Sequence, residues 1–435
     1  PTSVPRGSAL PMARKKIREF DSKRLLQQRL KSLRGIDLPL KAVSVNMDSN
    51  LDKLPREHGW LQESKLVVKP DMLFGQRGKH NLVLLNASWE EAVVFLRERL
   101  GQEVSLGAVS GQMTHFIVEP FVPHSVEFYM SIQATREHTI IRFSNCGGIE
   151  IEENWDKVKE LSLPWGTDVD TFDIAGYFGA EFPAASVDSL TAFIRGAVKV
   201  FDDLDMTFME MNPFTLDAAG MPLPLDMRGE LDDTAFFKHA NDWGHMEFPN
   251  PFGRKLTQEE EYISEMDAKT GASLKLTILN DKGHIWNLVA GGGASVVFAD
   301  TVSDLGYGHE LGNYGEYSGG PNTEETYHYT RTLLDVATRN PDGKPRALLI
   351  GGAIANFTDV AATFKGIMHA LKEFKGRLVD SRMRIYVRRG GPNYQKALQS
   401  MKDLETDLGV SIEVFGPETQ MTNIIPLAIQ WVESK

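Results

Sequence analysis

The C-terminal half of the chain repeats one unit, in which an apolar run of strand length is followed by glycines and then by a helical stretch. The runs and the residues that follow them are Ile285–Ala290 with Gly291–Gly293, Arg346–Ile350 with Gly351–Gly352, and Arg384–Val387 with Arg388–Gly391. Strands that alternate with helices form parallel sheets, which bind ligands at the carboxyl ends of their strands. The pattern therefore predicts an α/β fold with a flavodoxin-like, doubly wound parallel sheet.

The region before this half has a different pattern. Short β-rich runs, such as His115–Val118 and Phe128–Ile132, alternate with helical stretches and predict a mixed α/β domain. Residues 245–255 (HMEFPNPFGRK) carry two prolines and a glycine, which is typical of a linker. We therefore expect one domain over 12–245, a linker over 246–255 and a second domain over 256–435.

The first residues are interpreted separately. Residues 1–8 (PTSVPRGS) resemble the remnant of an engineered protease site, so residues 1–11 are expected to lie outside the folded domains and Met12 is the expected natural start. The basic stretch that follows has apolar residues from Ile17 to Leu26 at helical spacing, which predicts one helix. Two acidic residues within it, Glu19 and Asp21, argue against a transit peptide.

Composition excludes some function classes. The 435 residues include 47 Lys and Arg and 59 Asp and Glu, and a net charge of −12 argues against general nucleic-acid binding. The single cysteine, Cys146, cannot form an intramolecular disulfide, which fits a reducing compartment and predicts a cytoplasmic protein. No run of about 18 apolar residues is present, so we expect no membrane-spanning helix.

The first of three motifs in the N-terminal half puts positive charge into a glycine-containing loop. A strand run ends at Lys69, and the loop after it contains Gly75, Arg77, Gly78 and Lys79 before another strand run begins. Backbone N–H groups of such a loop can approach phosphates closely, and the cations add charge. A solvated basic hairpin has the same pattern, so this motif alone leaves phosphate binding open.

The second motif is residues 117–129 (IVEPFVPHSVEFY). Glu119 follows an apolar strand, and the backbone from Glu119 to Val122 could hydrogen-bond a flat adenine ring, with Phe121 packing on it. Glu127 could accept hydrogen bonds from ribose hydroxyls. A buried strand pair with a proline turn is an equally good reading of these residues.

The third motif is residues 209–233, in which two strands flank a turn at Ala219-Gly220. Glu210 and Asn212 alternate along the first strand, and the return strand would bring Asp226 near them. Oxygen ligands of this kind suit Mg²⁺, which prefers a few protein oxygens together with phosphates and water. A polar hairpin with surface acids would look the same.

Two glycine-rich motifs stand early in the C-terminal half. Gly291, Gly292 and Gly293 close a strand and open a helix, whose N-terminal N–H groups could bind phosphate. A tight turn that needs glycine for packing is the alternative. Residues 312–322 (GNYGEYSGGPN) are expected to form a loop in which Ser318 and the backbone could contact a ligand, or a plain surface loop.

Two further motifs follow the later strands. Asn356 and Thr358 are expected at the start of a helix, where donors could converge on an anion, although simple helix capping explains them equally. Arg388 and Arg389 follow a strand and precede a Gly-Gly turn. An arginine fork there suits a carboxylate, and paired surface arginines are the alternative.

The three N-terminal motifs together resemble the ATP-grasp fold. VVKP with its loop, then VEPF, then an E-x-N-P strand with a later aspartate occur in the order that this fold uses. The resemblance implies an ATP site with phosphate, adenine and ribose contacts and a Mg²⁺ site. The matching positions are Lys69, Arg77 and Gly78 for phosphates, Glu119, Phe121 and Val122 for adenine, Glu127 for ribose, and Asn212 and Asp226 for Mg²⁺.

The second half resembles the corresponding domain of the succinyl-CoA synthetase β-subunit. GGGASV, NYGEYSGGP, GGAIANFTDVAATFKG and VRRGGPNY are more similar still to the ATP-citrate lyase family, and this resemblance covers nearly all of 12–435. It implies a citrate site. The matching positions are Ser318, Gly319, Asn356, Thr358, Phe374 and Arg389, with Phe374 standing where an animal enzyme carries a tyrosine whose hydroxyl contact would be lost.

The resemblance also implies the chemistry. In this family a histidine takes a phosphoryl group from ATP and passes it to citrate, CoA displaces the phosphate, and citryl-CoA is cleaved to acetyl-CoA and oxaloacetate. The phosphohistidine, the CoA site and the citrate-synthase-like module lie in a later region of the family's sequence. We therefore expect no catalytic histidine here and no activity of the chain alone, with the helix near Gly293 receiving the phosphohistidine of a second subunit.

Two alternatives remain open at this point. One is the β-type subunit of another acid–CoA ligase, such as succinyl-CoA synthetase, and the RRGGPNY segment and the chain length argue against it. The other is a non-catalytic subunit that senses ATP and citrate. Asn212 and Asp226 favour catalysis over sensing, because sensing does not require phosphoryl transfer.

Overall fold

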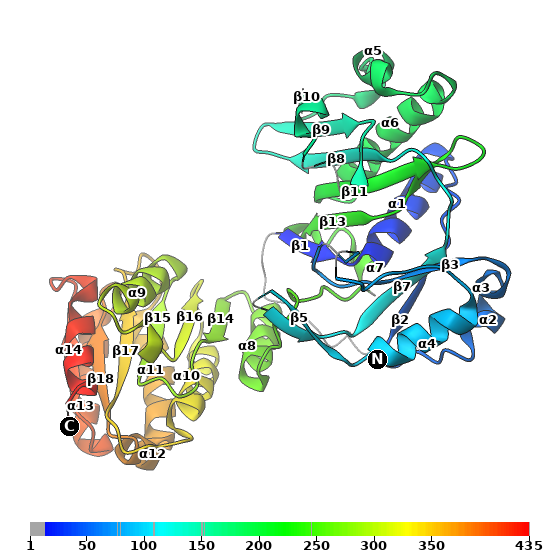
Figure 1. Ribbon diagram of the computed structural model, residues 1–435. Helices are drawn as coiled ribbons and strands as arrows, with labels where there is room; N and C mark the ends of the chain where they lie inside the picture. The colour runs from blue at the N-terminus through cyan, green and yellow to red at the C-terminus, as the bar shows by residue number, and fades with distance from the viewer. Residues whose placement is uncertain are drawn as a thin grey trace. The chain divides into compact units, whose positions relative to one another are not determined.

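The computed structural model describes residues 14–75, 77–78, 80–107, 109–148, 151, 153–244 and 246–434 (Figure 1). The chain divides into two compact units that meet between Lys255 and Leu256. The expected remnant at 1–11, Met12, Lys79 and His245 lie outside the described residues. Among the helices that the structure describes, none is long and apolar enough to cross a membrane.

The N-terminal unit contains a large antiparallel sheet. Helices α1 (Glu19–Arg34) and α6 (Val187–Asp203) pack together on it and contribute to one apolar core. The short helices α5 (Ile174–Phe178) and α7 (Ala240–Trp243) complete this layer. In order, the strands are β1 (Arg14–Ile17), β13 (Met227–Asp232), β11 (Met206–Leu216), β8 (Phe128–Ala134), β9 (His138–Ser144) and β10 (Lys159–Pro164), with β12 (Pro222–Pro224) beside β11.

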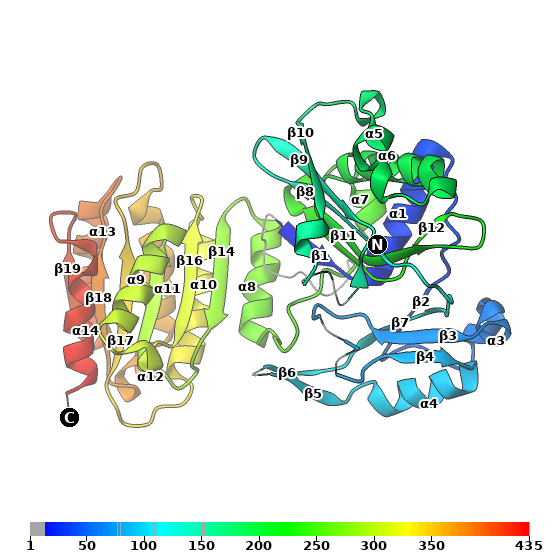
Figure 2. The ribbon, with the colours of Figure 1, turned by 45° about the horizontal axis from the view of Figure 1, so that its top comes forward.

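A smaller antiparallel sheet belongs to the same unit (Figure 2). Helix α4 (Trp89–Arg99) packs on it and begins with a capping box formed by Ser88 and Glu91. The chain leaves this sheet at Pro120 and enters the large sheet at Phe128, so residues 121–127 connect the two. The remaining elements are β2 (Val43–Asn46), β7 (His115–Pro120), β3 (Leu66–Pro70) and β4 (Leu84–Ala87) in sheet order, the ribbon β5 (Glu103–Leu106) and β6 (Val109–Gln112), and helices α2 (Leu54–Glu57) and α3 (Trp60–Glu63).

The single helix expected near the N-terminus is wrong in its first turn. Residues Arg14–Ile17 form β1, which pairs antiparallel with β13, and α1 begins only at Glu19. Arg18 between them is extended, with φ −65° and ψ 156°. The physical reason is tertiary, because the edge of β13 supplies backbone partners that a short amphipathic segment cannot find in an isolated helix.

The C-terminal unit confirms the doubly wound parallel sheet. Strands β16, β15, β17, β18 and β19 are parallel in this spatial order, and β14 joins β16 antiparallel at the edge. Helices α9 and α14 share a core with one face, while α8, α10, α11 and α13 cover the other. The bounds are α8 (Gln258–Lys269), β14 (Ser273–Ile278), β15 (Ile285–Ala290), α9 (Gly292–Asp304), β16 (Asn313–Ser318), α10 (Thr323–Thr338), β17 (Arg346–Gly352), α11 (Val360–Glu373), α12 (Lys375–Asp380), β18 (Met383–Arg388), α13 (Tyr394–Leu408), β19 (Ile412–Phe415) and α14 (Ile424–Val432).

The loop expected over residues 312–322 is wrong, because Asn313–Ser318 form β16 inside the sheet. Its glycines serve close packing. A Cβ on Gly315 would lie 2.4 Å from the Lys275 carbonyl, and one on Gly312 would lie 2.6 Å from the Trp286 ring. Only the residues after Ser318 turn, beginning with Gly319 at φ +74°.

The central strands β15 and β17 are buried along their whole length, which is why they read as continuous apolar runs. Helix α9 lies close to β17, because a Cβ on Gly351 would be 2.2 Å from the Phe298 ring. The parallel strand order places the reversal of winding direction at β15 and β17. The carboxyl ends of these two strands are therefore the expected ligand-binding edge of the unit.

Leu348 in β17 tests this core, because its side chain is fully buried. We expect Leu348→Ala to lower the free energy of unfolding of the C-terminal unit by about 2–5 kcal/mol, through lost burial and a residual cavity. Leu279→Ala is the control, since Leu279 is 54% exposed and should change that free energy by less than about 0.5 kcal/mol. Urea denaturation of the full chain, followed by a probe in this unit, gives both values.

Candidate functional site

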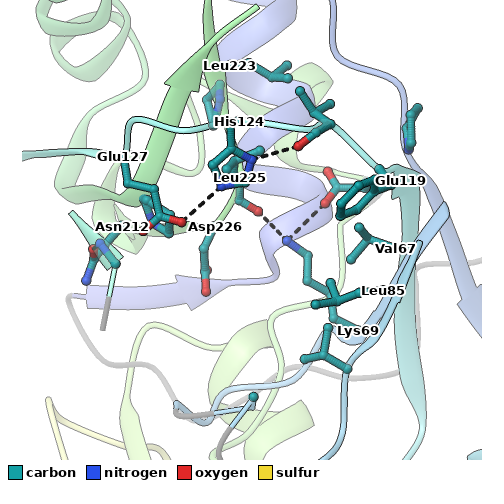
Figure 3. A pocket seen from close by; sticks show the side chains of 18 of the residues that line it. Val67, Lys69, Leu85, Glu119, His124, Glu127, Asn212, Leu223, Leu225 and Asp226 are labelled. Atoms are coloured by element: carbon teal, nitrogen blue, oxygen red, sulfur yellow. Dashed lines mark hydrogen bonds and ion pairs between the residues drawn. The ribbon is translucent and has the colours of Figure 1, made fainter. Parts of the chain in front are cut away.

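A cavity of about 560 Å³ lies in the N-terminal unit, and its wall takes residues from both sheets (Figure 3). This volume is in the range of small-ligand sites. All nine residues that the sequence predicted for nucleotide and metal contacts line it. They are Lys69, Arg77, Gly78, Glu119, Phe121, Val122, Glu127, Asn212 and Asp226.

One part of the cavity wall is apolar. Phe121 and Val122 lie in the connection between the sheets, and further apolar side chains come from strands on both sides. A flat ring fits a slot lined in this way, because its faces are apolar and its edge can meet backbone groups. Sequence reasoning missed the partners of Phe121 and Val122, which are scattered along the chain: Val67, Val83, Leu85, Ile151, Leu223 and Leu225.

Another part of the cavity wall is charged. The Lys69 ammonium lies 2.6 Å from Glu19 Oε1 and 3.0 Å from Glu119 Oε2, and it also donates to the Leu225 carbonyl. Burial disfavours the charge on Lys69, yet Glu119 and Glu19 together raise its pKa above the usual value. Lys69 therefore stays cationic at the cavity wall.

Arg77 continues the same charged cluster. Its guanidinium lies 2.8 Å from Glu19 Oε2 and 2.6 Å from Asp226 Oδ2, and a third bond of 2.7 Å goes to the Pro70 carbonyl. The loop that carries Arg77 is thus tied to helix α1 and to the bend after β12. Gly78 beside it has open space where a Cβ would be, so its backbone faces the cavity without obstruction.

Sequence reasoning missed Glu19 and Lys23 of α1, which complete this cluster. Lys23 lies 2.7 Å from both Glu19 and Glu119, and its side chain is 2% exposed. Burial alone raises the pKa of the Glu19 carboxyl, but Lys23, Lys69 and Arg77 hold that pKa far below its ordinary value. The signal was present, because Glu19 and Lys23 share the helix face of the buried Leu26 and Leu30.

The proposed ribose and metal residues lie at another part of the wall. Glu127 Oε1 lies 3.0 Å from His124 Nε2, and Asn212 Oδ1 accepts a 2.8 Å hydrogen bond from the Gly148 N–H. Asp226 lies in the bend between β12 and β13, and its carbonyl accepts a 3.0 Å bond from the Asn212 N–H. Asn212 and Asp226 are therefore neighbours through their backbones, and both line the cavity.

The side-chain oxygens of Asn212 and Asp226 can supply part, but not all, of the ligands of a cation. Among the residues that the structure describes, no group of three or more His, Cys, Asp or Glu could hold a metal ion. One carboxylate and one amide oxygen beside Arg77 suit Mg²⁺ that takes its other ligands from phosphates and water. Glu210 is not part of the cavity wall; its carboxyl lies 3.3 Å from the Tyr129 hydroxyl and 3.7 Å from Arg228.

In the C-terminal unit, most of the predicted citrate residues gather at the carboxyl ends of the parallel strands. Ser318 ends β16, and Gly319 follows it. Asn356 and Thr358 lie in the loop between β17 and α11. These two loops are adjacent, because a Cβ on Gly320 would lie 3.8 Å from the Phe357 ring.

Helix capping does not explain Asn356 and Thr358. Asp359 is the N-cap of α11, and its carboxylate accepts hydrogen bonds of 2.9 and 3.1 Å from the N–H groups of Ala361 and Ala362. The side chains of Asn356 and Thr358 are therefore not used as caps. A 2.9 Å hydrogen bond from the Ala355 N–H to the Gly390 carbonyl fixes their loop to the segment after β18.

The alternative of paired surface arginines is wrong, because Arg388 and Arg389 are 6% and 5% exposed. Arg388 donates to the carbonyls of Gly352, Pro417 and Thr419 and so holds the strand ends together. Arg389 donates to the Ala353 carbonyl, and its buried Nε has no hydrogen-bond partner among the described residues. Arg389 thus keeps donor capacity next to the Asn356 loop.

The glycines after β15 lie at the same edge. Gly291 has φ +98°, which lets the chain turn directly into α9. A Cβ on Gly292 would lie 2.6 Å from the Glu316 carboxylate, whereas Gly293 has open space at that position. Close packing therefore explains Gly292, and the N–H groups near Gly293 are the accessible part of the helix N-terminus.

Phe374 is the one predicted citrate residue that the structure does not bring to this edge. It follows α11, whose 14 residues at about 1.5 Å each separate it from Thr358 by roughly 20 Å. Its ring is 6% exposed, belongs to the apolar core and lies 4.8 Å from the Arg377 guanidinium. Phe374 therefore lies at the opposite end of α11 from the Asn356 loop.

The charged cluster can be tested through Lys23. We expect Lys23→Met to lower the free energy of unfolding of the N-terminal unit by up to about 3–5 kcal/mol, because Glu19 and Glu119 lose a buried counter-charge. The matched control is Lys31→Met on the same helix, whose pair with Asp37 is exposed and should contribute less than about 1 kcal/mol. Chemical denaturation at neutral pH compares the two; equal effects would show that the cluster does not stabilise this unit.

The comparisons with known proteins agree with this geometry. The family model described as the ATP-citrate synthase ATP-grasp domain matches residues 13–243, and the one described as ATP citrate lyase citrate-binding matches residues 254–431. ATP-citrate synthase alpha chain protein 2 of Arabidopsis thaliana is 56% identical over 421 residues, which cover 97% of this chain and 99% of the plant protein. The ATP-citrate synthase of Homo sapiens is 43% identical over 422 residues, which cover 96% of this chain and 38% of the human protein.

A solved structure gives the same result. ATP citrate lyase from Methanothrix soehngenii, determined in complex with citrate and coenzyme A, superimposes with a TM-score of 0.87 and 46% sequence identity, over 96% of this chain and 100% of that chain. The two family models together span almost all of the described residues, and both domains occur in the same order. The chain therefore belongs to the ATP-citrate lyase family and corresponds to its alpha-type chain.

Proposed function

We propose that this chain is the ATP- and citrate-binding subunit of an ATP-citrate lyase, which converts ATP, citrate and CoA to acetyl-CoA, oxaloacetate, ADP and phosphate. The observation that carries the proposal is the end-to-end match with a plant alpha chain, together with a nucleotide-type cavity and an anion-type strand edge in the same chain. This match favours the proposal over the β-type subunit of another acid–CoA ligase.

In the nucleotide cavity, Lys69, Arg77 and the Gly78 backbone would hold the ATP phosphates. Both cations are already fixed by carboxylates, so they are oriented before the nucleotide arrives and little side-chain freedom is lost on binding. The backbone from Glu119 to Val122 would hold adenine. Asn212 and Asp226 would hold Mg²⁺, which supplies positive charge at the reacting phosphates.

In the C-terminal unit, Ser318, Gly319, Asn356, Thr358 and Arg389 would hold citrate. Neutral donors from two loops and one buried guanidinium suit a ligand with three carboxylates. The Nε of Arg389 is the strongest support, because it is a buried donor without a partner among the residues that the structure describes, and this costs free energy that a carboxylate would recover. The N-terminus of α9, opening near Gly293, would face the phosphoryl group that citrate receives.

The remaining steps would take place with a second subunit. The match with this chain covers 38% of the human protein. We propose that a partner brings the phosphohistidine, the CoA site and the citrate-synthase-like module, and that the complex works in the cytoplasm without a nucleic-acid or membrane partner. A reactive histidine would then pass a phosphoryl group from the nucleotide cavity to citrate.

Reconstitution tests the proposed function. The purified chain is assayed for citrate-, ATP- and CoA-dependent acetyl-CoA formation alone, and again after it is mixed with the beta chain of the same source. We expect activity in the mixture and none from the chain alone. Substantial acetyl-CoA formation by the pure chain would disprove the subunit reading. If the chain binds ATP and citrate but acetyl-CoA formation by the partner is the same with and without the chain, a sensing subunit would be favoured.

Citrate affinity should depend on Arg389 more than on Asn356. Removing one member of a buried charge pair costs about 2–5 kcal/mol, and the low end corresponds to about a 30-fold loss of affinity. Loss of a neutral donor in Asn356→Ala should cost about 1–3 kcal/mol. Calorimetric titration of citrate should therefore rank wild type, Asn356→Ala and Arg389→Ala in order of falling affinity.

Two controls make this series specific. Phe374→Leu should leave citrate affinity within about twofold of wild type, because Phe374 lies at the other end of α11. ATP affinity should stay nearly constant in all variants, since the nucleotide cavity belongs to the other unit. Equal citrate affinity in wild type and Arg389→Ala would remove this arginine from the site.

A further inference from the structure

His124 lies in the wall of the nucleotide cavity, in the connection between the two sheets (Figure 3). Its Nδ1 lies 2.7 Å from the Val122 carbonyl oxygen, and its Nε2 lies 3.0 Å from Glu127 Oε1. The imidazole therefore bridges the two parts of this connection for which separate nucleotide contacts are proposed, the adenine backbone and the ribose carboxylate.

The chemistry of the two partners defines the state of the ring. A carbonyl oxygen and a carboxylate are acceptors only, so both ring nitrogens must donate for both bonds to exist. This arrangement requires the imidazolium form of His124. A neutral imidazole has one N–H and can keep only one of the two bonds.

The Glu127 carboxylate is also confined on its other side. Gly148 has φ +79°, and a Cβ there would lie 2.1 Å from Glu127 Oε2, so the carboxylate occupies space that only glycine leaves free. The Gly148 N–H in turn donates to Asn212 Oδ1 at 2.8 Å. Glu127 is thus held between His124 and the Gly148 backbone, in a chain of contacts that ends at a proposed Mg²⁺ ligand.

We propose that His124 is a positioning residue for the nucleotide, which orients Glu127 toward the ribose hydroxyls and so makes the subunit selective for ribonucleotides. The proposal rests on the proposed ATP site. His124 acts through Glu127, because its own two nitrogens are both occupied. With the bond to His124, the side-chain torsions of Glu127 are restricted before the nucleotide binds, and less entropy is lost on binding.

The only charged side chain bonded to His124 among the described residues is Glu127. Other charged residues in the cavity wall are Lys41, Lys69, Arg77, Glu119, Asp226 and Arg228.

The test compares Mg·ATP with Mg·2′,3′-dideoxy-ATP by calorimetric titration of the full chain. The ratio of the two affinities isolates the hydroxyl contacts, because both nucleotides carry the same phosphates and base. We expect this ratio to fall about tenfold in His124→Gln, in line with the loss of one charge-assisted hydrogen bond. Glu127→Gln should lower the ratio similarly, and the double variant should add little to either change.

Two matched measurements make the result specific. His309→Gln is the control, because His309 is an exposed histidine of the other unit, and it should leave the ratio unchanged. In each variant, retained binding of Mg·2′,3′-dideoxy-ATP shows that the N-terminal unit is folded.

Each outcome has one reading. An unchanged ratio in His124→Gln would overturn the role of His124 while the ATP site stands. A wild-type chain that binds neither nucleotide would instead overturn the proposed function itself. A fall of both nucleotide affinities by the same factor would make His124 a merely structural residue and would also overturn the proposal.

Discussion

The buried charge cluster around Glu19 is the interaction on which the N-terminal unit depends. It joins α1, which packs on the large sheet, to β3 and β7 of the small sheet through Lys23, Lys69 and Glu119. Three cations and three carboxylates compensate one another, once Arg77 and Asp226 are included. Because an uncompensated buried charge is costly, the two sheets are held at the spacing that leaves the cavity between them.

The same cluster prepares the cavity for its chemistry. A cation that binds phosphate must be charged, fixed in orientation and accessible to the ligand. Burial opposes the first requirement, because an unpaired charge is unfavourable in a buried site. Partial neutralisation by Glu19 and Glu119 resolves the conflict, because it keeps Lys69 protonated inside the wall. On the other side of the cavity, His124 and Gly148 play the corresponding part for the Glu127 carboxylate.

In the C-terminal unit, the order and direction of the strands bring the proposed binding residues together. Parallel strands bring their carboxyl ends to one edge, so loops that are far apart in the sequence meet there without any ion cluster. Arg388 holds the strand ends together by donating to three carbonyls, and the buried Nε of Arg389 has no partner within the described part of the chain. The two adjacent arginines thus differ in role: Arg388 stabilises the strand ends, and Arg389 is proposed to bind citrate.

By itself, the sequence determined what local pattern encodes. The apolar runs before Gly291 and Gly351 predicted the parallel sheet, and three ordered motifs predicted the nucleotide domain whose residues now line one cavity. These features are visible because alternation and glycine placement act over a few neighbouring residues. Residues such as Arg389 could be named because a polar residue directly after a buried strand lies at the sheet edge in any parallel fold.

Only the tertiary structure decided which side chains are partners. Gly312 and Gly315 looked like loop residues, but they lie in or beside a strand because Trp286 and Tyr329 pack against them. Phe374 could be separated from Arg389 only when the length of α11 was known. The ion pairs that Glu19 and Lys23 make with β3 and β7 join residues distant in sequence. The bridge made by His124 follows from loop geometry, which leaves no periodic signal. Local periodicity reports which face is buried, whereas pairing depends on the three-dimensional arrangement of elements that the sequence does not place next to one another.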